Sequence, residues 1–306
     1  MNGRVCIVTG ANAGIGFSTA LQLAELGAHV IMACRSQSKA EQAATQIRAQ
    51  ITKKSPARKL EDIKLDVMVV DLLSFASVKR FAAEFRARKL PLHVLINNAG
   101  IMMGSADGWV TPDGNNSVLQ VNTLSHFLLT LSLLDIMQAT PGEARIINLA
   151  SLAHRFGWID FANINGKGCT GCLCYSQSKL ANIMLTMELA RRLEAQPENR
   201  VTVHAVDPDS IYSSFYDNLP TPMWACFRPF LWLMKPIEIG AQTSVFVASS
   251  VNVYGLTGVH WFRCAQTRAS SACYDRQQCK DLWDLSLSLV HWNENRPAGV
   301  SLKLHL

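Results

Sequence analysis

The chain has 306 residues, of which 49% are apolar and 17% are charged, and its net charge is +6. This composition excludes a disordered chain and supplies enough apolar side chains for a substantial core. The basic residues are spread along the sequence without a basic run, which argues against nucleic-acid binding and leaves an anionic cofactor or a membrane surface to explain the charge.

A glycine-rich turn lies near the amino end between two predicted strands. Val5–Thr9 is an apolar run that predicts a strand, and a glycine-rich sequence then opens a helical pattern through Leu26. His29–Ala33 predicts the next strand. Glycines at such a turn let the backbone approach a pyrophosphate, whose charge the helix amino terminus favours. The pattern predicts a dinucleotide site, and its candidate ligands here are Gly10, Asn12, Gly14, Ile15 and Gly16.

A basic residue follows the second strand, where an NAD-binding protein has an acidic one. The sequence there is Ala33-Cys34-Arg35-Ser36, and the first acidic residue is Glu41. An arginine can bind a 2′-phosphate through two hydrogen bonds. The alternative is an ordinary solvated arginine. We therefore expect NADP (NADPH) as the cofactor in preference to NAD.

The third strand ends at an acidic residue with two interpretations. Ser38–Ile51 has a helical pattern, and the polar stretch Thr52–Lys59 predicts a surface loop. Val67–Val70 predicts a buried strand that ends at Asp71. Because ligands bind beyond the carboxyl ends of strands in such folds, Asp71 is placed to reach an adenine amino group. It is equally suited to cap the helix that begins near Ser74.

The fourth strand and the helix after it carry conspicuous amides. Val94–Ile96 predicts a strand, and Asn97–Gly100 follows it. Asparagines at a strand end either bind a cofactor or tie neighbouring strands together. Val118–Leu129 predicts an apolar helix with Asn122 and His126 one turn apart. For a buried asparagine, hydrogen bonding to the backbone is the alternative to a functional role.

A tyrosine and a lysine four residues apart follow the fifth strand. Ala144–Ala150 predicts that strand, Ser151 ends it, and a loop over 154–174 leads to a helix with Tyr175 and Lys179. A tyrosine hydroxyl has a pKa near 10, and a neighbouring ammonium favours the phenolate. On a helix the two residues share a face. The pattern indicates an acid/base pair, and a chance surface pair is the alternative.

An aromatic segment follows the sixth strand. Val201–Val206 predicts that strand, and Asp207-Pro208-Asp209 comes next. Residues 211–236 are rich in aromatic side chains, and 223–234 is too short to span a bilayer. The segment predicts a substrate lid or a stretch pressed into a membrane surface, with core packing as a third alternative. The remaining predicted elements are a helix over Ile237–Ala248, a strand over Gly258–Phe262 and a helix over Gln277–Val290.

The cysteines indicate a reducing compartment. They number nine, an odd count, and no secretory leader is visible, so we expect free thiols in a cytoplasmic protein. Cys169, Cys172 and Cys174 lie close together in the sequence. No fourth ligand follows at a spacing typical of zinc, so we expect no metal site.

Several features occur together in a fixed order. They are Thr9-Gly10-x-x-x-Gly14-Ile15-Gly16, Asn97-Asn98-Ala99-Gly100, Asn122, Ser151 and Tyr175-x-x-x-Lys179. This set resembles the short-chain dehydrogenase/reductase family over nearly the whole chain. Within the family, the sequences around Arg35, Asn97 and His126 resemble the retinol-dehydrogenase branch, to which WW-domain-containing oxidoreductases are similar.

The resemblance implies an α/β fold with a single Rossmann-type, doubly wound sheet of about seven parallel strands flanked by helices. A lid segment would follow the sixth strand. Residues 1–306 would form one domain, with a dinucleotide-binding half at about 1–150 and a catalytic half with the substrate lid at about 151–306. The implied activity is reversible hydride transfer between a nicotinamide cofactor and a small lipophilic alcohol or carbonyl compound, such as a retinoid, sterol or polyprenoid.

The resemblance also implies roles for individual residues. Tyr175 would be the acid/base, and Lys179 would lower its pKa and bind the cofactor ribose. Ser151 would bind the substrate oxygen, and Asn122 would hold a water molecule in a proton relay. Besides Tyr175 and Lys179, the cofactor contacts outside the glycine turn would include Arg35, Asp71, Leu72, Asn98, Ala99, Gly100 and Pro208.

The sequence departs from the family pattern at the end of the sixth strand. The family usually has Pro-Gly there, whereas this chain has Pro208-Asp209. A side chain and a negative charge at this place are expected to weaken nicotinamide binding. The alternative function is therefore a catalytically weak or inactive member that acts as an interaction or membrane-surface module.

Two further expectations concern assembly and location. The helices that carry Asn122 and Tyr175 commonly pair in similar proteins, which would make a homodimer. Branch members often have an amino-terminal anchor, but Met1 stands only a few residues before the first strand. We therefore expect a cytoplasmic protein with peripheral contact to an intracellular membrane through 223–234.

Overall fold

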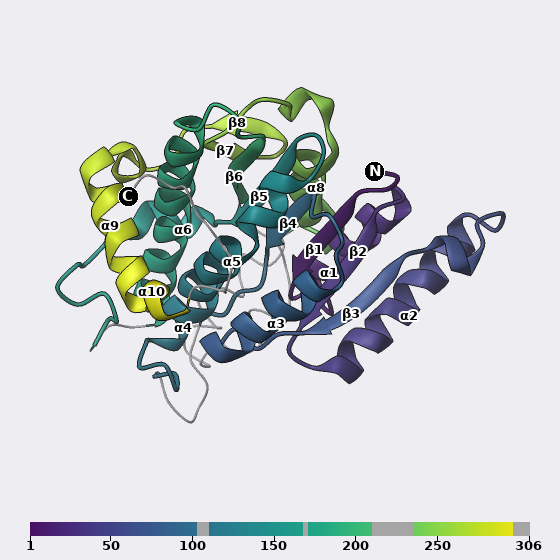
Figure 1. The fold of residues 1–306 in the computed structure, drawn as a ribbon, viewed down its shortest axis with the longest axis horizontal. Coiled ribbons are helices and arrows are strands. Elements are labelled where there is room, and N and C mark those ends of the chain that lie inside the picture. Colours follow the sequence, from purple (N-terminus) through teal and green to yellow (C-terminus); the bar gives the residue numbers. More distant parts are fainter. Residues whose placement is uncertain (103–109, 168–170, 210–234, 296–306) are drawn as a thin grey trace.

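An eight-stranded sheet forms the centre of the protein (Figure 1). The computed structural model describes residues 1–102, 110–167, 171–209 and 235–295. The strands are β1 (Val5–Thr9), β2 (His29–Cys34), β3 (Leu65–Val69), β4 (Val94–Asn97), β5 (Ala144–Leu149), β6 (Val201–Asp207), β7 (Val259–Phe262) and β8 (Ala265–Thr267). Their order is β3-β2-β1-β4-β5-β6-β7-β8. The first seven are parallel, as the family resemblance implies, and β8 is antiparallel to β7.

Helices cover both faces of this sheet. The α-helices of the described residues are α1 (Gly14–Glu25), α2 (Gln37–Lys54), α3 (Phe75–Ala87), α4 (Ser117–Leu119), α5 (Ser125–Ala139), α6 (Gly171–Glu194), α8 (Ile237–Ser249), α9 (Arg276–Leu289) and α10 (Trp292–Asn295). A π-helix, η2 (Gln120–Leu124), joins α4 to α5. Short 3₁₀ helices lie at η1 (Leu60–Asp62), η3 (Leu152–Phe156), η6 (Val251–Val253) and η7 (Ser271–Tyr274). One face of the sheet carries α1, α2 and α8, and the other carries α3, α5, α6 and α9 (Figure 1).

Alternation along the strands produces two cores. On β1, Val5 and Ile7 pack with α3, α5 and α6, whereas Cys6 and Val8 pack with α1, α2 and α8. Successive side chains of a strand point to opposite faces, so a strand buried on both sides needs apolar residues at every position. This requirement explains why β1 could be predicted from its unbroken apolar run.

The strand order reverses between β1 and β4. From β1 the chain builds outward to β2 and β3, then crosses to β4 and continues to β7. In open α/β sheets ligands bind at such a reversal, in the crevice beyond the carboxyl ends of the strands. The glycine turn after β1 and the segment after β4 therefore meet at the expected binding edge.

Two elements differ from the sequence prediction. Helix α2 continues to Lys54, into the stretch expected to be a loop, and its last turn carries Lys53 and Lys54, which favour a helix carboxyl terminus. Strand β8 follows β7 through Arg263 and Cys264, whose φ angles are 51° and 59°. Positive φ at both central residues is the geometry of a type I′ hairpin turn, which Asn-Gly usually signals.

Helices α4 and α5 with the π-helix between them form one apolar stretch, Ser117–Ala139, long enough to cross a membrane by length and composition. Its most apolar window is entirely buried inside the protein. The stretch packs against α3, α6 and the sheet, so burial in the core accounts for its composition.

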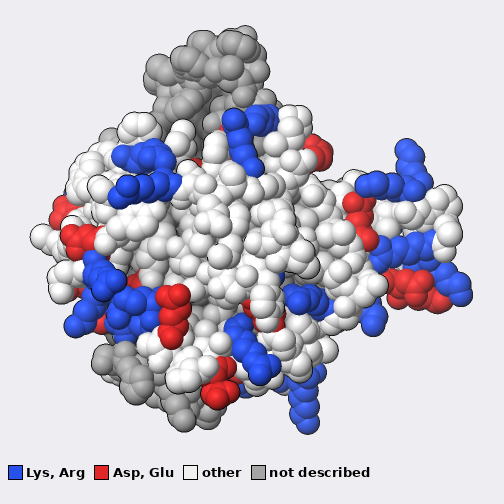
Figure 2. Space-filling model, turned by 90° about the horizontal axis from the view of Figure 1, so that it is seen from above, with Lys and Arg blue, Asp and Glu red and all other residues white. Residues whose placement is uncertain are grey.

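Charged side chains are dispersed on the face shown in Figure 2. Lys and Arg are scattered there among Asp and Glu around a broad uncharged area. The predicted lid, residues 211–236 with the stretch 223–234, lies outside the described residues except for Lys235 and Pro236.

Candidate active site

The glycine turn after β1 forms an open cradle at the start of α1. Gly10 and Gly14 have φ angles of 67° and 54°, which glycine adopts without strain. A Cβ on Gly16 would overlap the carbonyl oxygen of Gly10, whereas one on Gly14 would meet nothing within 4 Å. The N-cap Ala13 offers no side-chain acceptor to the first N–H groups of α1. These N–H groups and the space at Gly14 fit a bound phosphate.

Thr9 joins the ends of β1 and β4 behind this cradle. Its Oγ1 accepts hydrogen bonds from the backbone N–H groups of Asn98 at 2.9 Å and Ala99 at 3.0 Å. The side-chain amide of Asn98 donates to the Thr9 carbonyl at 2.7 Å, and Asn97 donates to Asn148 Oδ1 on β5 at 2.7 Å. Both amides therefore tie strand ends together, one of the two roles considered above. A cofactor contact from Asn98 stays a prediction.

His126 supports this junction from α5. Its Nε2 lies 2.9 Å from Thr9 Oγ1, and its Nδ1 lies 3.2 Å from the carbonyl oxygen of Asn122. Since a carbonyl only accepts, Nδ1 carries the proton, and Nε2 accepts the Thr9 hydroxyl proton. Burial lowers the pKa of His126 to about 4, although its hydrogen bond to Asn122 opposes the shift. From the sequence, His126 could be placed one turn after Asn122, but its bond to Thr9 could not be predicted.

Asn122 lies in the π-helix η2, and such widened turns often occur at functional sites. Its Nδ2 donates to the Ile101 carbonyl at 2.8 Å and to Ser178 Oγ at 3.0 Å, and its Oδ1 accepts from the Ile101 N–H at 2.8 Å. These bonds hold the segment after β4 against α6. The backbone-bonded alternative is therefore observed, and a role in holding a water molecule stays a prediction.

Lys179 is buried beside Tyr175 on α6. Its Nζ donates to the Leu149 carbonyl at 3.0 Å and lies 5.6 Å from the centroid of the Tyr175 ring. Burial lowers the pKa of Lys179 to about 8, and the negative charge of Asp207 opposes this shift. The ammonium is therefore still mainly charged at pH 7. Tyr175 is half-buried.

Ser151 and Gly100 complete the edge around this pair. Ser151 follows β5 after Ala150, two residues beyond the carbonyl that holds Lys179, and its Oγ accepts from the Ala153 N–H at 3.3 Å. A Cβ on Gly100 would lie 3.3 Å from Asn122 Oδ1 and 3.5 Å from Lys179 Nζ. The backbone at Gly100 thus passes close to two of the predicted catalytic side chains.

The outer part of the predicted cofactor site lies beyond β2 and β3. Arg35 is exposed and makes no hydrogen bond or ion pair within the described residues. Asp71 Oδ1 accepts from the Leu73 N–H at 3.0 Å. The helix after it, α3, is capped instead by Ser74, which corrects the alternative that Asp71 is the cap. Leu72 is buried, and its carbonyl accepts from Ser125 Oγ at 2.6 Å.

Asp209 takes the place of the usual glycine without leaving its charge unpaired. Its φ is 73°, a left-handed conformation that aspartate tolerates better than most residues. Its Oδ2 accepts from Lys235 Nζ at 2.7 Å and from Arg263 Nε at 2.7 Å. The negative charge expected beside Pro208 is therefore present, and Lys235 and Arg263 compensate it.

Comparison with known proteins agrees with this geometry. The family model of short chain dehydrogenases matches residues 4–222. Retinol dehydrogenase 12 of Mus musculus is 38% identical over 291 residues, which cover 94% of this chain and 86% of that protein.

Solved structures give the same result. A protein of Mycobacterium Paratuberculosis has a TM-score of 0.73 and 30% identity, covering 95% of this chain and 94% of that one. The Pseudomonas aeruginosa RhlG/NADP active-site complex has a TM-score of 0.65 and 25% identity, with coverage of 86% and 95%.

Substitution of Gly16 tests the cradle. We expect Gly16→Ala to weaken NADPH binding by at least about tenfold, because the new methyl group overlaps a backbone atom and the turn has to shift. Calorimetric titration with NADPH measures the change. Gly142→Ala is the control. Gly142 has a φ of 81°, so an alanine there is also strained, but its Cβ would meet no atom within 4 Å, and the residue precedes β5, away from the cradle. Equal affinities for wild type and Gly16→Ala would contradict the cradle.

The buried His126 predicts a pH dependence of stability. Its folded pKa of about 4 lies below the unfolded value of 6.5, so the unfolded chain binds more protons between these values. We expect the free energy of unfolding to fall by about 3 kcal/mol from this residue as the pH drops from 6.5 to 4. His126→Gln should lose this part of the dependence of the unfolding free energy on pH. Urea unfolding at pH 7 and 4.5 measures the free energy of unfolding, with His29→Gln, a substitution at a partly buried histidine of β2, as the control. Parallel pH profiles for wild type and His126→Gln would refute the low pKa of His126.

Proposed function

Since the chain belongs to the short-chain dehydrogenase/reductase family and is an oxidoreductase of its retinol-dehydrogenase-like branch, we propose that it transfers hydride between NADP and a lipophilic alcohol or the corresponding carbonyl compound. The proposed substrates are retinoid-, sterol- or polyprenoid-like. The observation that carries this proposal is the buried Lys179 ammonium beside the Tyr175 ring.

In the proposed mechanism Tyr175 exchanges a proton with the substrate oxygen. It gives the proton during carbonyl reduction and takes it during alcohol oxidation. The Lys179 ammonium makes this exchange easier because a nearby positive charge stabilises the phenolate. Negative charge develops on the oxygen of a carbonyl that accepts hydride. The hydroxyl groups of Tyr175 and Ser151 would donate to that oxygen.

The chain's own residues fit a dinucleotide at the crevice edge. When bound, a nicotinamide cofactor supplies or accepts the hydride. Gly10, Gly14 and the first N–H groups of α1 would bind its pyrophosphate, and Lys179 would bind the ribose next to the nicotinamide. The close approach of the Gly100 backbone to Lys179 supports this placement. Asn122 would keep that backbone in position through its bonds to Ile101.

Two observations support NADP as the preferred form. Arg35 is exposed directly after β2, and its guanidinium has no partner among the described residues. A free guanidinium there suits a 2′-phosphate, which it binds through two charge-assisted hydrogen bonds. The similar RhlG structure is a complex with NADP.

The surroundings of Ser151 support a lipophilic substrate. Leu152, Phe156 and Trp158 follow it and are 52%, 72% and 56% exposed. Exposed apolar side chains in one short segment are typical of a surface that meets an apolar partner. The similarity to a retinol dehydrogenase points to the same class of molecule. The same side chains support the proposed peripheral contact with a membrane. We also propose that the protein is cytoplasmic and forms a homodimer, and sedimentation measures its mass in solution.

The acid/base role predicts the behaviour of Tyr175→Phe. We expect kcat for NADPH-dependent reduction of retinal, a sterol ketone or a polyprenal to fall by roughly 10²–10⁴-fold, because the proton donor is lost. NADPH affinity should change little. Oxidation of NADPH is followed by absorbance, and affinity by calorimetry.

Tyr254→Phe is the matched control, because Tyr254 is an exposed tyrosine after η6. It should behave as the wild type. No turnover of any aldehyde or ketone by the wild type, together with no heat on NADPH titration, would favour an inactive interaction module instead.

The NADP preference predicts a selective effect at Arg35. Arg35→Ala should weaken NADPH binding by about 10–100-fold and leave NADH binding within about threefold, because only NADPH has the 2′-phosphate. Lys53→Ala removes an equal charge at the other end of α2 and should affect neither. Equal losses for NADPH and NADH in Arg35→Ala would overturn the preference.

A further inference from the structure

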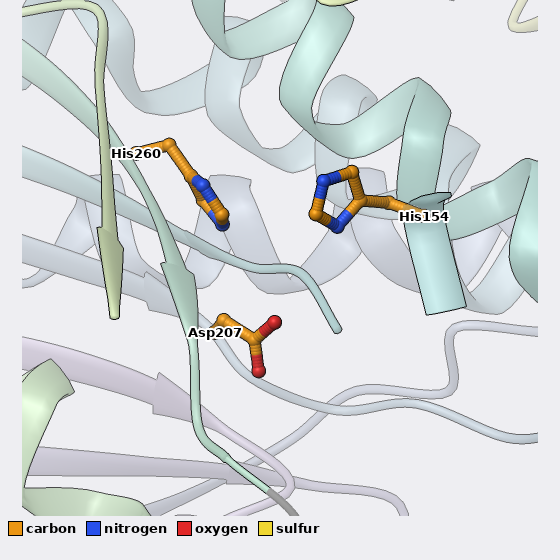
Figure 3. Close-up of side chains that lie close together, drawn as sticks. All are labelled: His154, Asp207 and His260. Carbon is orange, nitrogen blue, oxygen red and sulfur yellow. The ribbon is translucent and has the colours of Figure 1, made fainter. Parts of the chain in front are cut away.

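Two histidines and an aspartate from distant parts of the chain meet inside the protein (Figure 3). His154 comes from η3, Asp207 from the end of β6 and His260 from β7, and the figure shows the three side chains turned toward one another. One ligand atom from each lies within 4.8 Å of those of the other two. The residues are 0%, 3% and 3% exposed. They surround one buried point from three directions.

His154 is already oriented as a ligand would be. Its Nδ1 lies 2.7 Å from the Ser151 carbonyl oxygen, so Nδ1 carries the proton and Nε2 carries the lone pair. Histidines that bind metals almost always donate their other N–H to a carbonyl or carboxylate in this way. In the structure Nε2 accepts one long hydrogen bond, 3.3 Å, from the Ser270 N–H. A cation bound at Nε2 would replace that bond.

His260 is the unsatisfied member of the cluster. Neither of its ring nitrogens has a hydrogen-bond partner among the described residues, and the ring packs edge-on against His154 with centroids 5.1 Å apart. Buried polar groups in native proteins are nearly always paired. The ring therefore indicates a missing partner at the centre of the cluster.

Asp207 supplies the negative charge. Its Oδ1 accepts from the Asp209 N–H at 3.1 Å, and it forms no ion pair with any described residue. Asp209, two residues later, pairs with Lys235 and Arg263 instead. A buried carboxylate without a paired cation is unfavourable unless a charge nearby compensates it. Lys179 and Arg155 lower the pKa of Asp207 from a distance without pairing with it, whereas a bound cation at the cluster would contact the carboxylate directly.

We propose that His154, Asp207 and His260 form a divalent-cation site, with Zn²⁺ as the best match. Two imidazoles, one carboxylate and a water molecule are a common tetrahedral set for zinc, with bonds of about 2.0–2.2 Å. Such bonds place ligand atoms roughly 3.3 Å apart. The cluster, with separations of up to 4.8 Å, closes on the ion by rotation of its side chains.

The bound ion would connect three segments that frame the proposed reaction site. It would join η3, which begins directly after Ser151, to the strand end that carries Pro208 and to β7. Its role is therefore to fix the positions of these segments. None of its three ligands is a predicted catalytic or cofactor-binding residue, and Asp207 acts on Lys179 only through its charge, so metal binding tests the site separately from hydride transfer. Sequence spacing does not indicate this site, because its ligands are far apart in the sequence.

Metal titration of the full-length protein tests the site. After removal of metals with a chelator, we expect Zn²⁺ to bind in a 1:1 ratio with a Kd on the order of 1 μM or tighter. The midpoint of thermal unfolding should rise by a few degrees. Co²⁺ used as a probe should give the visible absorption of a tetrahedral site without the thiolate band that cysteine ligands produce.

Three variants decide whether the cluster is responsible. His260→Gln and Asp207→Asn keep similar size and should each weaken Zn²⁺ binding by at least about tenfold. His29→Gln should bind as the wild type, because His29 and Asp66 form a partly buried His–Asp pair outside the cluster. Unfolding of the metal-free variants confirms that each is folded. No saturable binding, a thiolate band, or equal affinities in wild type and both cluster variants would overturn the proposal.

Discussion

The candidate site depends on one buried positive charge at the carboxyl edge of the sheet. Lys179 is only 4% exposed, and burial lowers its pKa to about 8 against the influence of Asp207. Keeping the ammonium charged there at pH 7 costs about 3 kcal/mol relative to a solvated lysine. The Leu149 carbonyl accepts bonds from both Lys179 and Asn182, so the strand end holds the charge in place. A destabilising group kept in such a position is characteristic of an active site.

The main elements of the fold could be predicted because the strands buried on both faces are mostly apolar, as in Val5–Val8 of β1. Strand β8 could not be predicted in the same way, since Ala265–Thr267 is short and weakly apolar and its turn has no Asn-Gly signal. There Arg263 adopts positive φ while its side chain binds Asp209, a long-range contact that no local pattern contains. The π-helix contains Asn122, whose bonds to Ile101 are likewise long-range contacts that no local pattern contains, so the sequence predicts a regular helix there.

The site was predictable where a local pattern carries the chemistry and ambiguous where a polar group has two uses. The glycine turn and the Tyr175–Lys179 spacing are local patterns. Asp71 is different, because a carboxylate at a strand end suits a helix cap as well as a ligand, and only the position of Ser74 shows that the cap is taken. The bond between Thr9 and His126 joins residues far apart in the sequence. This bond forms only because the fold brings β1 next to α5, which no local pattern indicates.

Asp207 and Asp209, both at the end of β6, have opposite surroundings: the first is buried without an ion pair and the second is paired with two cations. Asp207 is the last residue of the strand and is buried, which raises the pKa of its carboxyl group to about 6, and its charge favours the ammonium of Lys179. Asp209 has left the strand in a left-handed conformation, where Lys235 and Arg263 compensate its charge. The side chain that replaces the usual glycine is thus held by the β7–β8 turn. Since its charge is already compensated, the electrostatic reason to expect weak cofactor binding no longer applies, and only the steric effect of the side chain remains.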